Sequence, residues 1–484
     1  MNDEWGKADG RLTSLPVFHS SFINPHSSFL SSLLFLTDSY KVSHYRQYPP
    51  GTERVYSYFE SRGGQFPEAV FFGLQYYLRR YLAGQVITAA DIDAAESFYQ
   101  QHFGQPLFNH VGWQHVLEAH GGRLPVRIRA VPEGMVVPAH NVLMTIENTD
   151  PACYWLTNWL ETVLVQVWYG TTVATQSRAM KKIIHGYLAA TGTPRQAGWK
   201  LHDFGLRGSS SIETAAVGGA AHLISFHGTD NIAALVLARE HYDCPMAGQS
   251  IPAAEHSTIT AWGEDHEVDA MRNMLQQFPS GTVAVVSDSF DIYRACSEYW
   301  GRQLRDLVLQ RDGVLVVRPD SGDPPQMVVR VLELLGEAFG TRQNSQGYRV
   351  LDPHVRVIQG DGIDFAMLDT ILAALTSRGW SADNVSFGSG GGILQKLNRD
   401  TLKFAFKCSS VTIDGQDRDV FKRPVTDRGK QSKAGRLKLV HDGGRLATIA
   451  ESAPGEDLLQ LVFENGAIVQ QSRFDEIRDR AAGE

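Results

Sequence analysis

One repeating pattern between about residues 199 and 395 restricts the fold more than any other feature of this sequence. An apolar run typical of a buried strand ends in polar or glycine residues, and a segment with helical spacing of its apolar residues follows. Buried strands that alternate with helices form a parallel sheet covered on both faces. The pattern therefore predicts a closed or nearly closed α/β barrel, with a doubly wound open sheet as the alternative. The strand-like runs are GWKLHDFG, AHLISFHGTD, GTVAVVSDS, GVLVVRPDSGD, HVRVIQGDG and NVSFGSGGG, and a less obvious one precedes PAAEHS.

The segments on either side of this pattern predict a second, β-rich unit. Residues 124–148 alternate apolar and polar side chains around a Pro-Glu-Gly turn, and two hairpin patterns with Asp-Gly-Gly and Asn-Gly turns lie near the carboxyl end. We therefore expect residues 29–155 and 397–484 to form one antiparallel domain, with residues 156–396 as the barrel. Residues 1–28 are expected to be a mobile tail, and ACYWLTNWLETVLVQVWYG a long buried helix.

Composition excludes several classes of protein. The net charge of -8 argues against a general nucleic-acid binder, and 43% hydrophobic with 20% charged residues is typical of a soluble globular protein. No apolar run reaches the roughly 18 to 20 residues that a membrane helix needs. The cysteines form no C-x-x-C motif, so neither a disulfide framework nor a zinc knuckle is predicted, and a cytoplasmic setting fits best. They are Cys153, Cys244, Cys296 and Cys408.

Polar groups collect at the predicted carboxyl ends of the barrel strands, where barrel enzymes place their catalytic residues. Any one of them also fits a helix cap, Asp288 before SFDIY in particular. Together they place carboxylates, two arginines and a histidine beside a glycine loop, which indicates an anionic, phosphorylated substrate and a divalent cation. These residues are Asp203, Arg207, Asp230, Glu255, His256, Asp288, Arg318, Asp320, Asp323, Asp361 and the loop 388–392.

Two of these strand ends favour phosphate or sugar binding. GSGGGILQK (388–396) opens a predicted helix whose backbone N–H groups can cradle phosphate, although it fits neither of the common glycine-loop motifs. In RPDSGDP, Arg318 offers a bidentate fork for phosphate or carboxylate. Asp320 and Asp323 offer acceptors for sugar hydroxyls or for waters on Mg²⁺, and the segment also fits an ordinary strand and turn. His256 and His266 lack the spacing of a helical zinc pair.

Several long motifs in a fixed order resemble the nicotinamide phosphoribosyltransferase family, from about Leu34 onward. They include TDSYKVSHYRQYPP, KLHDFGLRGSSSIETA, IPAAEHSTITAWG, RPDSGDP and FGSGGGILQKLNRDTLKFAFKCS. The resemblance implies an incomplete parallel α/β barrel packed on a β-rich domain, in a head-to-tail homodimer with two shared active sites. The implied reaction joins nicotinamide to 5-phosphoribosyl-1-pyrophosphate and yields nicotinamide mononucleotide and pyrophosphate, a step of NAD salvage without nucleic-acid or membrane partners.

The resemblance also implies roles for individual residues. Phe204 and the partner subunit's Tyr40 stack on the two faces of the pyridine ring, and Asp230 accepts a hydrogen bond from the carboxamide. Arg207 and Arg318 bind phosphate or the amide region. The sugar and phosphate contacts are assigned to Asp320 for the ribose hydroxyls, to Gly360, Asp361, Gly390 and Gly391 for the phosphoribosyl group, and to Arg399, Lys407, Lys422 and Lys430 for pyrophosphate or nucleotide phosphates.

His256 receives a separate role from the resemblance. It implies that ATP phosphorylates this histidine and that hydrolysis of the phosphoenzyme stimulates synthesis, with Glu255 orienting the imidazole or activating water. A neutral imidazole is a competent phosphoryl acceptor, and a purely structural histidine is the alternative. Mg²⁺ is expected mainly through the substrate pyrophosphate. Ala405 stands where we expect a serine, which removes a phosphate hydrogen bond of about 1 kcal/mol and puts the efficiency of ATP coupling in question.

Three other functions remain open on the sequence. One is a nicotinate or quinolinate phosphoribosyltransferase with the same fold, although the Asp230 carboxylate repels a carboxylate substrate. Another is a non-catalytic interaction protein, although such a scaffold gains nothing from desolvating so many charged strand-end residues. The third is a metal-dependent barrel hydrolase, which requires a bound transition metal.

Overall fold

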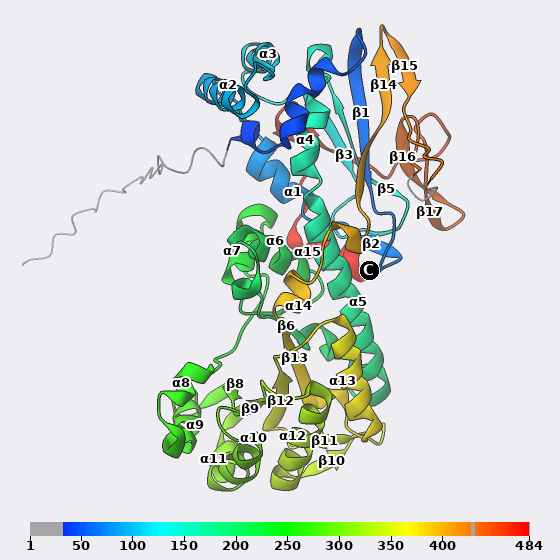
Figure 1. Cartoon of the computed structure of the whole chain (residues 1–484). Coiled ribbons are helices and arrows are strands. Elements are labelled where there is room, and N and C mark those ends of the chain that lie inside the picture. Colours follow the sequence, from blue (N-terminus) through cyan, green and yellow to red (C-terminus); the bar gives the residue numbers. More distant parts are fainter. Residues whose placement is uncertain (1–31, 427–430, 484) are drawn as a thin grey trace, which may run out of the picture.

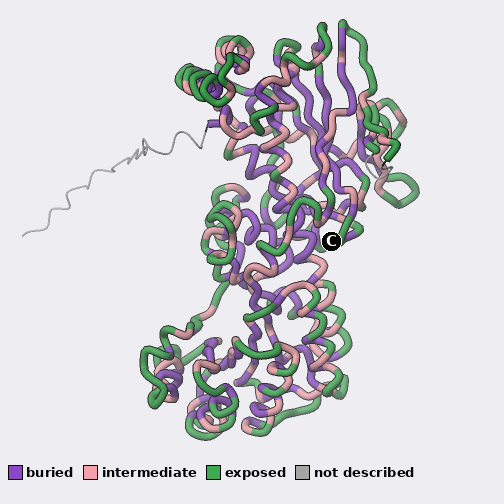
Figure 2. Tube along the Cα trace, in the orientation of Figure 1, coloured by how far each residue is buried: buried purple, intermediate pink, exposed green. Residues whose placement is uncertain are grey.

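The computed structural model describes residues 32–426 and 431–483, and the predicted tail 1–28 lies outside these residues. An antiparallel sheet with its helices forms one end of the molecule, and a parallel α/β barrel forms the other (Figure 1). The long helix α5 (Val167–Thr191) runs between the two parts. Buried segments continue through the middle of both parts (Figure 2), because one cluster of buried apolar side chains joins them.

The seven-stranded antiparallel sheet joins the two ends of the chain, as predicted. Its strand order is β15-β14-β1-β5-β3-β18-β19. At its centre β1 pairs with β14, with Val55 opposite Val411, and with β5, with Tyr58 opposite Thr145. The strands are β1 (Thr52–Glu60), β3 (Val126–Ala130), β5 (Val142–Asn148), β14 (Ala405–Ile413), β15 (Gln416–Asp419), β18 (Gln460–Glu464) and β19 (Ala467–Ile468).

The predicted hairpins and the Pro-Glu-Gly turn are confirmed. Gly134 has φ +87°, and a Cβ there would lie 2.3 Å from the carbonyl oxygen of Ile477, so glycine is required. The Asp-Gly-Gly turn joins β16 to β17, and the Asn-Gly turn joins β18 to β19. Three shorter pairs complete the β structure: β2 (Glu68–Val70) with β4 (Val136–Pro138), β10 (Thr341–Gln343) with β11 (Arg349–Leu351), and β16 (Leu437–Asp442) with β17 (Arg445–Ala450).

The six-stranded parallel sheet confirms the incomplete barrel. Its order is β7-β6-β13-β12-β9-β8, so the edge strands are β7 and β8. Residues 249–253, which run into PAAEHS, lie between these edges, because Gln249 bridges to Gly228 and Ala253 bridges to Ala284, both in parallel. The strands are β6 (Leu201–Asp203), β7 (Gly228–Thr229), β8 (Ser280–Val286), β9 (Asp312–Arg318), β12 (Val355–Gln359) and β13 (Val385–Ser389).

Helices separate the barrel strands along the chain, as the apolar spacing predicts. Two of them, α12 and α13, match the predicted amphipathic segments, and α5 packs against α6 and α13. The helices of this part are α6 (Ile212–His222), α7 (Ile232–Tyr242), α8 (His256–Thr260), α9 (Glu267–Gln277), α10 (Ile292–Arg294), α11 (Arg305–Gln310), α12 (Pro324–Phe339), α13 (Phe365–Ser377) and α14 (Gly391–Leu394).

Two local predictions are wrong. The run AHLISFHGTD is mostly the end of α6 and a loop, and only Gly228–Thr229 form a strand. Only Ala221 and His222 of the run belong to α6. The backbone N–H groups of residues 223–226 then donate to carbonyl oxygens of Gly219, Ala221 and His222, so the chain leaves the helix through tight turns before it reaches Gly228. The predicted long helix divides into α4 (Leu156–Leu164) and α5, because the chain tightens near Val165 into hydrogen bonds that span three residues.

The remaining helices pack around the antiparallel sheet and α5. They are α1 (Leu74–Tyr77), α2 (Ala89–Phe103), α3 (His110–His120), α4 (Leu156–Leu164) and α15 (Phe474–Ala482), with a short helix at Ser39–Arg46. Arg478 of α15 donates hydrogen bonds to backbone carbonyls of the barrel part, including that of Leu223 at 2.8 Å. Within the described residues, none of the helices combines the length and the apolar character needed to cross a membrane.

Candidate active site

A cavity of about 840 Å³ opens at the carboxyl ends of the barrel strands. It gathers most of the residues that the sequence predicts, from strand ends that are separated along the chain. The predicted residues that line it are Phe204, Arg207, Asp230, Glu255, His256, Arg318, Asp320, Gly360, Asp361, Gly390 and Gly391. The cavity is also lined by residues that the sequence analysis did not single out, namely Leu206, Ser257, Gly362, Ile363 and Lys396.

Phe204 lies over the strand ends because two glycines leave it room. Its backbone N–H donates to Ser389 at 2.9 Å, which holds the residue next to β13. A Cβ on Gly388 would lie 1.9 Å from the Phe204 ring, and a Cβ on Gly360 would lie 3.6 Å from it and 3.2 Å from Asp320 Oδ1. The ring therefore occupies the space that a side chain at position 388 would need.

Three charged residues of the cavity lining, His256, Arg318 and Asp320, belong to one hydrogen-bonded group with Asp288. Arg318 Nη2 donates to Asp320 Oδ2 at 3.0 Å. Asp288 Oδ2 accepts from the backbone N–H of Asp320 at 2.9 Å and from the Ser321 hydroxyl at 2.6 Å. Asp288 Oδ1 lies 3.1 Å from His256 Nε2, while His256 Nδ1 lies 4.0 Å from Asp320 Oδ2. One nitrogen of the imidazole is thus held by Asp288, and the other faces Asp320.

Two aspartates have roles that differ from the expectation. Asp288 is not a helix cap, because Asp291 caps α10 by accepting from the N–H groups of Tyr293 and Arg294. Asp323 does cap a helix: it accepts from the backbone N–H of Gln326 at 3.3 Å at the start of α12. Asp323 is also absent from the residues that line the cavity, so it does not join Asp320 there, and the simple turn interpretation fits this residue.

Glu255 and Asp230 each accept a hydrogen bond from a serine hydroxyl. Glu255 accepts from Ser257, so the carboxylate that contacts His256 is that of Asp288 and not that of Glu255. Asp230 accepts from Ser250, and its backbone N–H donates to Asp203 at 2.9 Å. Both carboxylates still line the cavity and can accept further hydrogen bonds.

Asp203 supports the base of the site from within the core. Its side chain accepts from the backbone N–H of Gly205 at 2.7 Å and from Asn231 Nδ2 at 3.0 Å. Burial raises the pKa of Asp203 to about 6, although both hydrogen bonds oppose this shift. Asp203 is fully buried and does not line the cavity, so it positions the strand ends that carry Phe204 and Asp230.

The helix that follows the glycine loop is shorter, and the loop more tightly supported, than the sequence suggests. The helix after it, α14, has only four residues. Three hydrogen bonds to carbonyl oxygens fix the loop and its surroundings: from Gln176 to Gly392 at 3.0 Å, from Tyr169 to Leu394 at 2.9 Å, and from Ser389 to Ile363 at 2.6 Å. The loop backbone is therefore held in place without any ligand.

Tyr40 does not line the cavity. Its side chain is 60% exposed on the short helix Ser39–Arg46 in the sheet part of the molecule. The helix is fixed to α4, because Lys41 Nζ lies 2.9 Å from Glu161 and His44 Nδ1 lies 2.6 Å from Asn158 Oδ1. The ring is thus presented outward on a well-supported helix.

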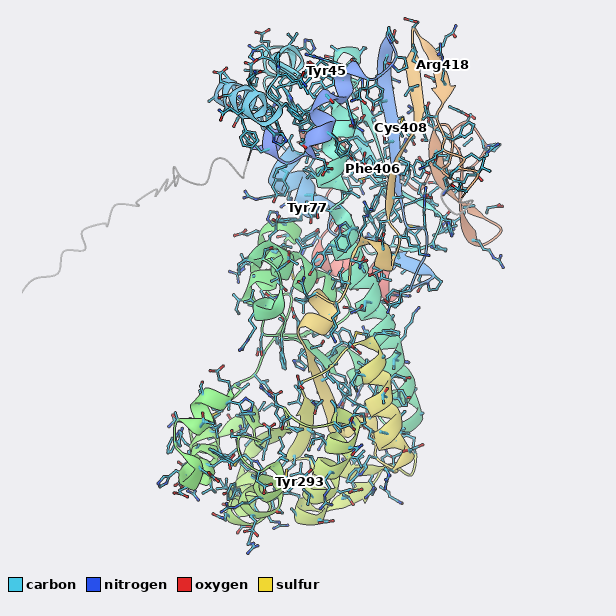
Figure 3. All side chains as sticks on the ribbon, in the orientation of Figure 1. Tyr45, Tyr77, Tyr293, Phe406, Cys408 and Arg418 are labelled. Carbon is cyan, nitrogen blue, oxygen red and sulfur yellow. The ribbon has the colours of Figure 1, made fainter. Side chains whose placement is uncertain are left out.

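Three of the predicted phosphate-binding cations are also absent from the cavity lining, namely Arg399, Lys407 and Lys422. We call these three residues the β14 basic face. Burial lowers the pKa of Lys407, and the positive charges of Arg62, Arg399 and Lys422 lower it further against the opposing effect of Glu161. These cations therefore lie near one another around β14. Figure 3 labels Phe406 and Cys408, which flank Lys407, in the sheet part of the molecule. Lys430 lies outside the described residues.

Known proteins resemble this chain over almost its whole length. The model of the nicotinate phosphoribosyltransferase family matches residues 199–467, and that of the nicotinamide phosphoribosyltransferase N-terminal domain matches residues 32–128. A nicotinamide phosphoribosyltransferase of Xanthomonas campestris is 52% identical over 465 residues, which cover 94% of this chain and 98% of that protein. The chain belongs to the nicotinamide phosphoribosyltransferase family. The resemblance inferred from its motifs is confirmed.

A second relative and a solved structure are also similar to this chain. A nicotinamide phosphoribosyltransferase of Acinetobacter baylyi is 34% identical over 494 residues, which cover 94% of this chain and 98% of that protein. The crystal structure of nicotinate-nucleotide pyrophosphorylase from Pyrococcus furiosus has a TM-score of 0.60 at 16% identity and covers 93% of this chain and 95% of that one. At this low identity the structural likeness shows the shared fold alone.

Proposed function

We propose that this family member transfers the phosphoribosyl group of 5-phosphoribosyl-1-pyrophosphate to nicotinamide and so produces nicotinamide mononucleotide in NAD salvage. The observation that carries the proposal is one cavity that holds Phe204, Asp230 and the Arg318–Asp320 pair together. An aromatic ring suits a flat base, a carboxylate suits the NH₂ group of a carboxamide, and an arginine suits phosphate. A carboxylate at position 230 disfavours nicotinate, because two like charges repel.

The reaction requires little proton transfer to or from side chains of the protein. The lone pair of the pyridine nitrogen forms the new bond to the anomeric carbon of the ribose, and the bond from that carbon to the pyrophosphate oxygen breaks with its electron pair. Positive charge develops on the ribose during this exchange. Asp320 accepts from the ribose hydroxyls, and the carboxylates around it favour this charge. Arg318 favours the departing anion, since its Nε is buried without a hydrogen-bond partner in the described residues.

The oxygen ligands of the cavity fit Mg²⁺, which prefers carboxylates, phosphates and water. Asp361 is exposed to the cavity beside Asp320, so the two can hold waters of a cation bound to the substrate pyrophosphate. When bound, the cation neutralises part of the charge on the leaving group.

We further propose that His256 accepts a phosphoryl group from ATP. Asp288 holds Nε2, so Nδ1 is the nitrogen that attacks the γ-phosphorus. The bond from that phosphorus to the bridging oxygen breaks, and ADP leaves with the electron pair. Water then cleaves the bond between Nδ1 and phosphorus and releases phosphate, and Glu255, which also lines the cavity, orients this water. Exposure of 45% of the His256 side chain leaves room for this transfer.

The site is completed, on this proposal, by a second copy in a head-to-tail homodimer. The partner subunit's Tyr40 covers the second face of the pyridine ring, and its β14 basic face binds phosphates. Two observations support this assembly: Tyr40 is exposed on a rigid helix, and the β14 basic face lies outside the cavity of its own chain.

The reaction is tested with the purified protein, Mg²⁺, 5-phosphoribosyl-1-pyrophosphate and either nicotinamide or nicotinate. We expect nicotinamide mononucleotide and a strong preference for nicotinamide. Asp230→Asn is expected to reduce this preference by about 10- to 100-fold, because the substitution removes a hydrogen bond to a charged group and such a bond contributes a factor of this size. Asp323→Asn is the matched control, because Asp323 caps α12 outside the cavity. Equal turnover of the two bases contradicts the specificity, and no product from either one favours a non-catalytic protein.

A further inference from the structure

Four side chains that can bind a metal converge in the sheet part of the molecule. His115 and His120 belong to α3, whereas Asp150 and Cys153 belong to the turn that follows β5. Asp150 Oδ2 lies 2.7 Å from His115 Nε2 and 2.7 Å from His120 Nε2. One ligand atom from each of the four residues lies within 4.8 Å of the others. Within residues 32–426 and 431–483, no other group of three or more such residues meets this condition.

We propose that His115, His120, Asp150 and Cys153 bind a zinc ion. Two imidazoles directed at one carboxylate oxygen, with a thiol beside them, form the mixed nitrogen, oxygen and sulfur donor set that Zn²⁺ takes. Cys153 is fully buried, and its thiol has no hydrogen-bond partner among the described residues. A thiolate also favours zinc over magnesium or calcium, which prefer oxygen ligands.

The geometry is close to that of an occupied tetrahedral site. Metal–ligand bonds of about 2.0 to 2.3 Å put the ligand atoms of a zinc tetrahedron about 3.3 to 3.8 Å apart. The observed separations range from 2.7 Å to no more than 4.8 Å, so small side-chain rotations bring all four atoms to that spacing. Asp150 offers a single oxygen, because its Oδ1 already accepts from the backbone N–H of Ala152 at 2.9 Å.

The two segments are held together by packing that does not need the ion. Trp113 of α3 packs edge to face on Trp155, with ring centroids 4.7 Å apart. Asn148 Nδ2 donates to the carbonyl oxygen of Asp150 at 2.8 Å, which fixes the turn to the end of β5. The four ligand residues are therefore presented by a rigid frame, as a specific metal site requires.

The position indicates a structural ion. Figure 1 places α3 in the sheet part of the molecule, far from the barrel strands that carry the cavity. Four protein ligands leave no open position for a substrate, which is typical of structural zinc sites. The turn leads into α4, whose Asn158 and Glu161 hold the helix that carries Tyr40. Zinc at this site therefore fixes the platform of Tyr40, and its binding does not depend on the proposed activity.

The test is zinc binding by the full chain, produced without a histidine tag and stripped with a chelator. We expect calorimetric titration with ZnCl₂ to show one tight site per chain and the melting temperature to rise on saturation. His115→Gln and Asp150→Asn are expected to weaken zinc affinity by more than about 100-fold, because even second-shell substitutions cost 10- to 100-fold. His185→Gln, on the exposed face of α5, is the matched control and keeps the wild-type affinity.

Two further measurements make the outcome decisive. His256→Gln should still bind zinc tightly, because His256 lies in the cavity and not at α3. Loss of tight binding in this variant would show that the ion is bound in the cavity. Replacing zinc by Co²⁺ should give a thiolate-to-cobalt charge-transfer band that is lost in Cys153→Ala. The proposal is overturned if the unmodified chain binds no zinc, or if His115→Gln, folded by circular dichroism, binds it as tightly.

Discussion

The barrel-end cavity and the β14 basic face differ in how their charges are partnered. In the cavity, Asp288 fixes both His256 and the backbone of Asp320, so the polar groups position one another within a single chain. On the β14 basic face, Arg399 and Lys422 are exposed and form no ion pair with a carboxylate of the described part of the chain. The first region is preorganised, whereas the second keeps its charge available for a ligand. Within one copy, the cavity and the β14 basic face are therefore two separate groups of charged residues.

The largest expected effect tests the cavity side. His256→Ala should abolish ATP hydrolysis and the stimulation of synthesis by ATP, because no other imidazole lines the cavity among the described residues. Some basal transfer should remain, since the pyridine nitrogen attacks without a histidine base. The measurement is phosphate release from ATP with and without the other substrates.

The control for this change is His266→Ala, an exposed histidine that contacts Asp269 outside the cavity. It should hydrolyse ATP at the unmodified rate. ATP hydrolysis that survives in His256→Ala would remove the phosphohistidine from the proposal.

The next effect tests the β14 basic face. Arg399→Ala should lower kcat/KM for 5-phosphoribosyl-1-pyrophosphate by about 10- to 100-fold, because a charged hydrogen bond to phosphate contributes about 1.5 to 3 kcal/mol. Arg418→Ala is the matched control: this arginine is exposed on β15 and labelled in Figure 3 near the outer end of the sheet. Equal kinetics for the two variants would show that the β14 basic face binds no substrate phosphate.

The smallest effect concerns the aromatic floor of the cavity. A methyl group at position 388 collides with the Phe204 ring, so Gly388→Ala should displace the ring. Because part of one aromatic contact is then lost, KM for nicotinamide should rise by about tenfold. Gly186→Ala, on α5 with open space around it, is the control and should leave KM unchanged. An unchanged KM in Gly388→Ala would contradict the stacking role of Phe204.

Strand ends were predictable because their signal is local. Apolar runs that end in polar residues identified β6, β8, β9, β12 and β13, and parallel packing then brings Phe204, His256 and Arg318 to one cavity. The weak run expected before PAAEHS forms isolated bridges to both edge strands and no regular strand. The prediction failed in AHLISFHGTD, where Leu223, Ile224 and Phe226 are buried in turns after α6, because an apolar run alone does not separate a buried strand from other buried segments.

Contacts between distant segments could not be predicted in the same way. Asp288 fits a helix cap by its local sequence, and only the fold shows that it holds His256. The cluster at α3 joins a helix and a turn that are separated along the chain, and its single cysteine lacks the paired spacing of a zinc motif. In the proposed homodimer, Tyr40 and the β14 basic face reach a cavity only through a second copy, which no spacing within one chain reveals.

Subunit mixing tests the central claim most directly. Phe204→Ala alters the cavity half of the site and Arg399→Ala the basic half, so each homodimer should retain no more than about one tenth of the unmodified activity at substrate concentrations below KM. After the two variants are mixed and allowed to exchange subunits, activity should return to about one quarter of the unmodified level, since half of the random dimers are mixed and each has one intact site. Activity that stays at the sum of the two separate variants would show that each copy works alone and that the composite site is wrong.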